Sequence, residues 1–370
     1  MDRRETERLL DAIRQARAAG EPAAMATVVH VKGSAYRREG TRMFVRRNGT
    51  YECALSGGCL EPTVAEAAAR VIATGDPVVV SYDLAEDSVW GLGIGCSGAV
   101  DIRIERIEDD AVTNEWLTIL ERGEAAVLVT PLSGVSGRLI VRGTGDVVGA
   151  LTDPIVEQRA VENARARLGA QYPASGPERV GSAEVFYEIT NPPPSLVIFG
   201  AGHDAAPVAQ LAWTLGFAVT VVDVRAAFLT EERFSRATRV CAHFSQFAEL
   251  VALGPGSFSL IMNHHVERDQ ESLRFSLESD AAYIGVLGPR SRYDRLLAGL
   301  AEQGYVPDPA RAARVRSPVG LSLGAETPEE VATSILGELL AIRRGFDGGF
   351  LSGSIVSLHH PEDQRLLARS

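Results

Sequence analysis

"VIFGAGHDAAPVAQLAWTLGFAVTVVDV", residues 197–224, carries the strongest fold signal in the chain. An apolar run leads into G-x-G-x-x-A, a helical pattern, a second apolar run and an acidic residue. In such a unit Gly200 permits a tight turn, Gly202 lets backbone come close to a phosphate, and Ala205 permits close helix packing. Asp223 ends the second run, where an acid can bond ribose hydroxyls. This order predicts a Rossmann-type fold with a nucleotide or related phosphate ligand at the helix N-terminus.

The C-terminal half contains four apolar runs separated by helical stretches: "SLVIFG", "FAVTVVDV", "SFSLIMN" and "AAYIGVLG". They predict the strands of a parallel sheet that is covered on both faces. Because ligands bind at the carboxyl ends of such strands, polar residues that follow them are binding candidates. For any one of them, a loop or capping role is the alternative. The candidates of this half are Gly200, Gly202, His203, Asp223, Arg225 and His264.

The N-terminal half has a different pattern. Residues 1 to about 105 alternate short strand-like runs with helices, and residues 124–152 hold three runs that suit an antiparallel set. The proline-rich stretch that follows ends in three consecutive prolines, which is typical of a linker. The sequence therefore predicts an α/β protein with a mixed α/β domain over 1–170, a linker over 171–194 and a Rossmann-type, doubly wound domain over 195–370.

Two cysteines of the N-terminal half lie among glycines, in "SGGCLEP" (56–62) and "GLGIGCSGAV" (91–100). Glycines such as Gly58 and Gly95 weaken regular structure, so we expect them to clear space for a bulky ligand. A helix is expected directly after Cys59, and its N-terminus favours the thiolate form. The alternative for a lone cysteine is a small buried hydrophobic residue.

Composition narrows the class of protein. The net charge of −11 argues against a nucleic-acid backbone or an anionic membrane surface as the main partner. The four cysteines show no disulfide or zinc spacing, and Cys53 and Cys241 are interpreted as small buried hydrophobic residues. The N-terminus has no apolar signal core and no run long enough to cross a bilayer. These features predict a cytoplasmic protein with reduced thiols.

The motifs taken together resemble the xanthine dehydrogenase accessory factor family (XdhC/CoxI). The resemblance rests on "GSAYRREGTRMFV", "SGGCLE", "GLGIGCSGAV", "FGAGH", "VVDVR", "YIGVLGPRSR" and "SPVGLSLGAETPEEVATSILGELLA", in that order. It implies an accessory protein of molybdenum hydroxylases that binds the molybdenum cofactor and protects it while a cysteine desulfurase installs its terminal sulfur. It also implies insertion of the cofactor into the apoenzyme, and a homodimer.

The resemblance also assigns residues. The family's cysteine motifs fall on Cys59 and Cys96, and its Rossmann motifs fall on Gly200, Gly202, His203, Asp223, Arg225 and His264. The chain departs from the family at Ser97, Asp204 and Pro289. An acid at position 204 would repel a phosphate at the adjacent turn.

The chemistry of the candidate residues suits molybdopterin, which has a phosphate and a soft metal-dithiolene end. Thiolates of Cys59 and Cys96 suit the metal. Arg37, Arg38 and Arg42 suit the phosphate through bidentate contacts, although a solvated hairpin would look the same.

Three hypotheses follow. The first is a chaperone of the molybdenum cofactor without turnover of its own. The second is an NAD(P)-dependent oxidoreductase with His203 or His264 as acid or base, in which Asp223 favours NAD over NADP. The third is a sulfur-transfer enzyme with a persulfide on Cys59 or Cys96.

Overall fold

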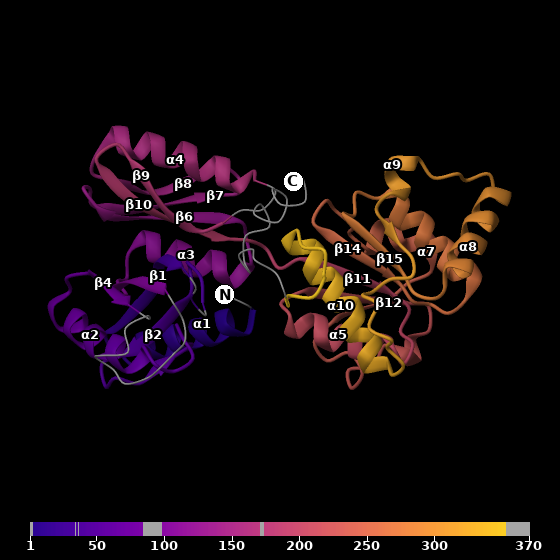
Figure 1. The fold of residues 1–370 in the computed structure, drawn as a ribbon, viewed down its shortest axis with the longest axis horizontal. Coiled ribbons are helices and arrows are strands. Elements are labelled where there is room, and N and C mark those ends of the chain that lie inside the picture. The colour runs from indigo at the N-terminus through magenta and orange to yellow at the C-terminus, as the bar shows by residue number, and fades with distance from the viewer. Residues whose placement is uncertain (1–2, 34, 36, 84–97, 171–173, 353–370) are drawn as a thin grey trace. The chain divides into compact units, whose positions relative to one another are not determined.

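The computed structural model describes residues 3–33, 35, 37–83, 98–170 and 174–352 of the chain. These form two compact units, Met1–Pro192 and Pro193–Ser370, called unit 1 and unit 2 below (Figure 1). The division falls within the run of three prolines. Among the residues described, no helix is both long and apolar enough to cross a membrane.

Unit 1 begins with an antiparallel sheet. Its strand order is β3 (Tyr51–Glu52), β2 (Arg42–Arg46), β1 (Ala23–Gly33), β5 (Gly98–Arg106) and β4 (Val78–Asp83). Side chains alternate between the faces of a strand. Ile102 and Ile104 of β5 therefore pack with α2 (Glu61–Thr74) in one core, whereas Arg103 and Glu105 face the opposite way. On that opposite side lie α1 (Arg3–Ala18) and α3 (Ala111–Arg122).

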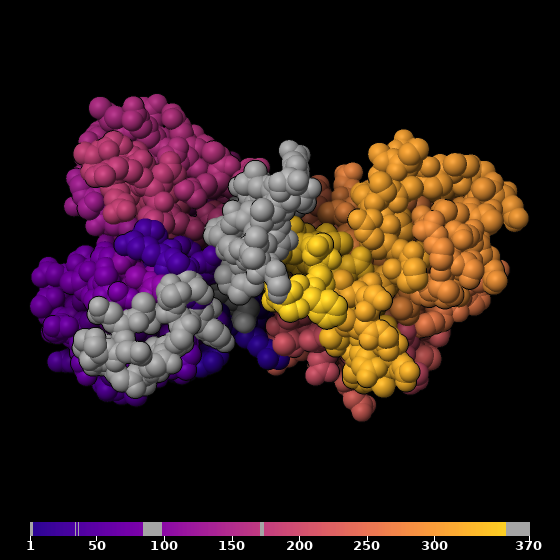
Figure 2. Space-filling view, in the orientation of Figure 1, coloured from indigo at the N-terminus to yellow at the C-terminus, as the bar shows by residue number. Residues whose placement is uncertain are grey.

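A second antiparallel sheet completes unit 1, and α4 (Pro154–Leu168) covers one of its faces (Figure 1). Its order is β8 (Val147–Leu151), β7 (Gly137–Arg142), β6 (Ala126–Ser133), β10 (Ala183–Thr190) and β9 (Gly176–Val180). In Figure 2 the residues around the first sheet form a purple region of the surface, and those around the second sheet form an adjacent magenta region.

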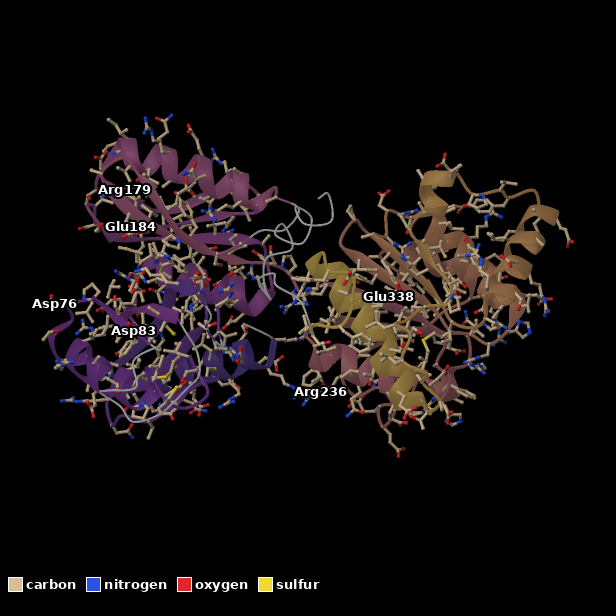
Figure 3. The ribbon with its side chains drawn as sticks, viewed as in Figure 1. Asp76, Asp83, Arg179, Glu184, Arg236 and Glu338 are labelled. Carbon is tan, nitrogen blue, oxygen red and sulfur yellow. The ribbon has the colours of Figure 1, made fainter. Side chains whose placement is uncertain are left out.

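The structure corrects the predicted linker. Residues 171–194 contain β9 and β10, and Arg179 and Glu184 are cross-strand partners on them (Figure 3). The prolines mislead the interpretation because they avoid the central strand. Pro177 lies on β9, an edge strand, where a missing N–H is tolerated, and the three consecutive prolines follow the end of β10.

Unit 2 contains a six-stranded sheet whose strands are all parallel, which confirms the predicted fold class. Its order is β13 (Thr238–Cys241), β12 (Ala218–Asp223), β11 (Ser195–Phe199), β14 (Ser257–Ile261), β15 (Tyr283–Val286) and β16 (Val315–Arg316). This is the doubly wound order, with its topological switch between β11 and β14.

Helices cover both faces of this sheet. α5 (Ala205–Thr214) and α10 (Pro328–Arg344) pack on one face, and α7 (Val266–Glu278) and α8 (Arg290–Glu302) pack on the other. The short helices η1 (Ala226–Phe228), η2 (Phe244–Gln246), α6 (Phe247–Leu250) and α9 (Pro309–Ala312) lie in the connections. Because β11, β12 and β14 are parallel neighbours, the loops that follow them meet at one edge of the sheet.

A buried ion pair joins the two sheets of unit 1. Arg42 of β2 pairs with Glu188 of β10, and their side chains are only 4% and 7% exposed. The Arg42 guanidinium also lies 4.1 Å from the centre of the Trp116 ring. A charge in this position needs its partner, because an uncompensated buried charge is strongly destabilising.

Replacing Glu188 by Gln is therefore expected to lower the free energy of unfolding by about 3–5 kcal/mol, because it leaves Arg42 without its buried counter-charge. Urea denaturation followed by circular dichroism measures the loss. Glu184→Gln is the matched control, since Glu184 lies on the same strand but is exposed, and it is expected to change stability by at most about 0.5 kcal/mol. Equal stability of the two variants would show that the pair does not hold the sheets together.

Candidate functional site

The loop that carries Cys59 is organised by the hydroxyl of Ser56. Ser56 Oγ accepts hydrogen bonds from the backbone N–H groups of Gly58, Cys59 and Leu60, each at 3.2 Å. The Cys59 thiol also donates to this oxygen, at 3.3 Å. One side chain thus fixes both the backbone of the loop and the direction of the thiol.

Glu61, the first residue of α2, anchors Ser56. Its carboxylate is fully buried and accepts from Leu55 N at 2.9 Å, Ser56 N at 2.7 Å and Ser56 Oγ at 2.6 Å. Burial alone raises the pKa of Glu61, but these hydrogen bonds outweigh it and hold the pKa below its ordinary value. The carboxylate is therefore ionised in the folded protein.

Sequence reasoning misses Ser56 and Glu61 as site residues. The usual helix-start signal places the acid three residues after the serine, whereas here it comes five residues later. Gly58 has φ +111°, which requires glycine, while a Cβ there would meet open space. The structure thus supplies a conformational reason for Gly58.

Cys59 itself is partly exposed and lies two residues before α2 begins. The second candidate thiol, Cys96, lies outside the described residues together with Gly95. Within the described ranges, no group of three or more histidine, cysteine or acidic side chains is arranged to hold a metal ion. A cofactor held at this loop would therefore meet Cys59 as its soft donor.

The other two cysteines differ from one another. Cys53 is buried, as predicted, and burial raises the pKa of its thiol to about 11. Cys241 is exposed, so its prediction as a buried residue is wrong. It ends β13, an edge strand, where side chains are less completely covered.

Two of the three arginines predicted to hold a phosphate, Arg37 and Arg42, have acidic partners within unit 1. Arg37 is paired with Glu5 of α1. Arg42 is buried between the sheets with Glu188. The structure therefore does not bring these two guanidinium groups together as a free pair beside Cys59.

In unit 2, the glycines after β11 make room for the protein's own atoms. A Cβ on Gly200, which has φ +113°, would lie 2.4 Å from Met262 O. A Cβ on Gly202 would lie 2.7 Å from Asp204 Oδ1. Gly200 is thus required by its backbone whether or not a phosphate binds, whereas a side chain at position 202 would displace the Asp204 carboxylate.

Asp223 and Arg225 are brought together. Arg225 donates from Nε to Oδ1 at 2.9 Å and from Nη2 to Oδ2 at 2.8 Å, and the Ala201 amide donates to Oδ2 at 2.8 Å. Burial opposes ionisation of Asp223, but these hydrogen bonds prevail and lower its pKa. Both carboxylate oxygens are therefore already hydrogen-bonded within the protein.

His264 and Asp204 form a second pair, at the switch point between β11 and β14. His264 Nε2 lies 2.7 Å from Asp204 Oδ2, and this hydrogen bond raises the pKa of His264 against partial burial. The backbone of His264 has φ +57°, which is unusual for a residue other than glycine. His203, just before Asp204, is exposed at the same edge. The arrangement provides an imidazole with a carboxylate partner.

Comparison with known proteins matches both units. Residues 196–339 match the model of the XdhC Rossmann domain, and residues 16–83 match that of the XdhC and CoxI family. The chain is 32% identical to a probable xanthine dehydrogenase subunit of Bacillus subtilis (strain 168), over 88% of this chain and 94% of that protein. It is 23% identical to the molybdenum cofactor insertion chaperone PaoD of Escherichia coli (strain K12), over 88% and 84%.

A solved structure has a similar fold over nearly the whole chain. The crystal structure of a xanthine dehydrogenase from Bacillus halodurans is similar with a TM-score of 0.74 and 30% identity, over 94% of this chain and 98% of that one.

Glu61→Gln tests the architecture of the Cys59 loop. It is expected to cost about 1.5–3 kcal/mol at neutral pH, because charge-assisted hydrogen bonds from the loop are weakened. Since the folded state lowers the pKa of Glu61, its contribution is complete above the unfolded value of 4.5 and is lost as pH falls through the folded value. The difference between wild type and variant should therefore shrink in acid, which urea titrations at several pH values measure.

The matched control for this test is Glu157→Gln. Glu157 makes one comparable contact, accepting from Leu151 N at 2.7 Å beside the start of α4, with no cysteine nearby. Its smaller set of contacts predicts a smaller loss. A Glu61→Gln variant no less stable than this control would contradict the assigned role of Glu61.

Proposed function

The chain belongs to the XdhC and CoxI family, and from this premise we propose that it is an accessory protein that binds the molybdenum cofactor and supports its insertion into a molybdenum hydroxylase. The name of the E. coli relative, a molybdenum cofactor insertion chaperone, supports this role. The name of the B. subtilis relative supports an enzyme of the xanthine dehydrogenase type as the recipient.

The observation that carries the proposal is Cys59, a partly exposed residue whose thiol is fixed by Ser56. Ser56 and Glu61 hold its loop before any ligand arrives, so little conformational entropy is lost on binding. The cofactor would supply a soft metal with dithiolene ligands, for which a cysteine sulfur is a suitable donor. In this proposal Cys59 holds the metal end, and Cys96 is the second sulfur donor.

The finer parts of the proposal concern partners. A cysteine desulfurase supplies the terminal sulfur of the bound cofactor, and the chain works as a homodimer in the cytoplasm. These parts are supported by the resemblance of the motifs around Cys59 and Cys96 to those of the family.

A second candidate function is an NAD(P)-dependent oxidoreductase. It is favoured by the Asp204–His264 pair at the switch point, where an imidazole could exchange a proton with a bound substrate. The hydrogen bonding of Asp223 argues against it, since a ribose would have to compete with Arg225 for the carboxylate.

Equilibrium binding of purified molybdenum cofactor distinguishes the candidates. Cys59→Ala is expected to weaken binding at least tenfold, about 1.4 kcal/mol, because a metal–sulfur interaction is lost. Cys241→Ala is the matched control, since it removes an exposed thiol from unit 2, and it should bind like wild type. NAD and NADP are titrated in parallel.

Cofactor binding unchanged in both Cys59→Ala and Cys96→Ala would contradict the chaperone proposal. Saturable binding of NAD or NADP alone, insensitive to both substitutions, would favour the oxidoreductase.

A further inference from the structure

The carboxylate of Asp204 lies over the glycine turn that follows β11. A Cβ built on Gly202 would meet Asp204 Oδ1 at 2.7 Å, and the next nearest atoms are Cδ2 and Nε2 of His264, at 3.5 and 3.8 Å. In the G-x-G-x-x-A pattern, the second glycine has no side chain so that a pyrophosphate can approach its backbone. In this chain the space beside that glycine is taken by a carboxylate and an imidazole of the protein itself.

Asp204 is directed toward this turn by His264 and not by the helix that it precedes. Although it is the residue before α5, its side chain makes no capping hydrogen bond. Its Oδ2 lies 2.7 Å from Nε2 of His264, which belongs to the loop after β14. The Asp204 side chain is only 18% exposed, and His264 adopts φ +57°. The carboxylate is therefore fixed over the turn by a residue of the neighbouring loop.

The backbone of the turn is held from a second direction. Arg233, in the connection between β12 and β13, donates from Nη2 to Gly202 O at 2.7 Å and from Nη1 to Phe228 O at 2.8 Å. On the other side, a Cβ on Gly200 would lie 2.4 Å from Met262 O, so the turn packs directly on the loop after β14. The turn cannot move away from the Asp204 carboxylate without breaking these contacts.

A carboxylate in this place competes with a phosphate. An ionised carboxylate only accepts hydrogen bonds, as a phosphate does, so both groups need the same N–H donors and repel one another. Nε2 of His264 is already engaged by Asp204 and is not free for a phosphate. The residues present beside Gly202 therefore do not fit the phosphate that a Rossmann-type turn ordinarily holds.

We propose that Asp204 is a specificity-determining residue of the unit 2 crevice, whose carboxylate, held by His264, excludes nucleotides and other phosphorylated ligands. A ligand of this crevice must present an uncharged or cationic group beside Gly202. The same exclusion applies to the phosphate of the molybdenum cofactor. The inference concerns unit 2 and does not depend on the proposed role of Cys59.

Isothermal titration calorimetry of the full chain with ADP and with adenosine tests the proposal. Asp204→Ala is expected to bind ADP at least about tenfold more tightly than wild type, because the competing anion is removed. Adenosine has the same base and ribose but no phosphate, so its affinity is expected to be the same for both proteins. A gain confined to ADP identifies the phosphate as the excluded group, and a gain in affinity cannot arise from misfolding.

Two further variants separate the charge of Asp204 from its other effects. Asp204→Asn keeps the shape of the side chain and removes its charge, so it is also expected to bind ADP more tightly than wild type. Glu278→Ala is the matched control for net charge, because Glu278 is the last residue of α7 and pairs with Arg274 of the same helix. It should bind ADP like wild type.

Binding of ADP by Asp204→Ala that is no tighter than that by wild type would overturn the proposal. An equal gain for adenosine would also contradict it, because the side chain would then block the crevice by its volume and not by its charge. The same gain in Glu278→Ala would show that the effect comes from the net charge of the chain.

Discussion

The period-two alternation of β5 determines what lies on each side of the first sheet. Ile102 and Ile104 point toward α2 and complete an apolar core, which fixes the helix whose first turn follows Cys59. Arg103 and Glu105 point toward the second sheet, where they join Arg42 and Glu188 in a buried charged layer. A shift of one residue in register would exchange the two sets, so the position of the thiol loop and the charge between the sheets depend on the same constraint.

The two halves of the chain satisfy their polar groups in different ways. In unit 1, Glu61 and Ser56 hold the loop of the partly exposed Cys59, so this loop is ordered without a ligand. In unit 2, two of the predicted ligand-binding side chains already have partners within the protein, since Asp223 is bound by Arg225 and His264 is paired with Asp204. A dinucleotide would have to compete with these partners.

Much of the fold follows from the sequence, because strand and helix periods are local. The parallel sheet and the β11–α5–β12 unit can be predicted from the pattern that begins in residues 197–224. β9 and β10 are not predicted, because one proline lies on the edge strand β9 and three follow the end of β10, and such a proline-rich sequence is typical of a linker. The site is less predictable, since side-chain partners depend on tertiary structure. The pairing of Arg42 with Glu188, on different sheets, has no local signal, and Asp223 and Arg225 could face either a ligand or each other.

The proposed function depends on Cys59 as a sulfur ligand to the metal of a bound molybdenum cofactor. This contact can be tested by molybdenum K-edge X-ray absorption of the cofactor-loaded chain, compared between wild type and Cys59→Ala. The sulfur scattering around molybdenum is expected to decrease in the variant. Identical spectra from the two proteins, each with cofactor bound, would show that the thiol does not contact the metal and would contradict the claim.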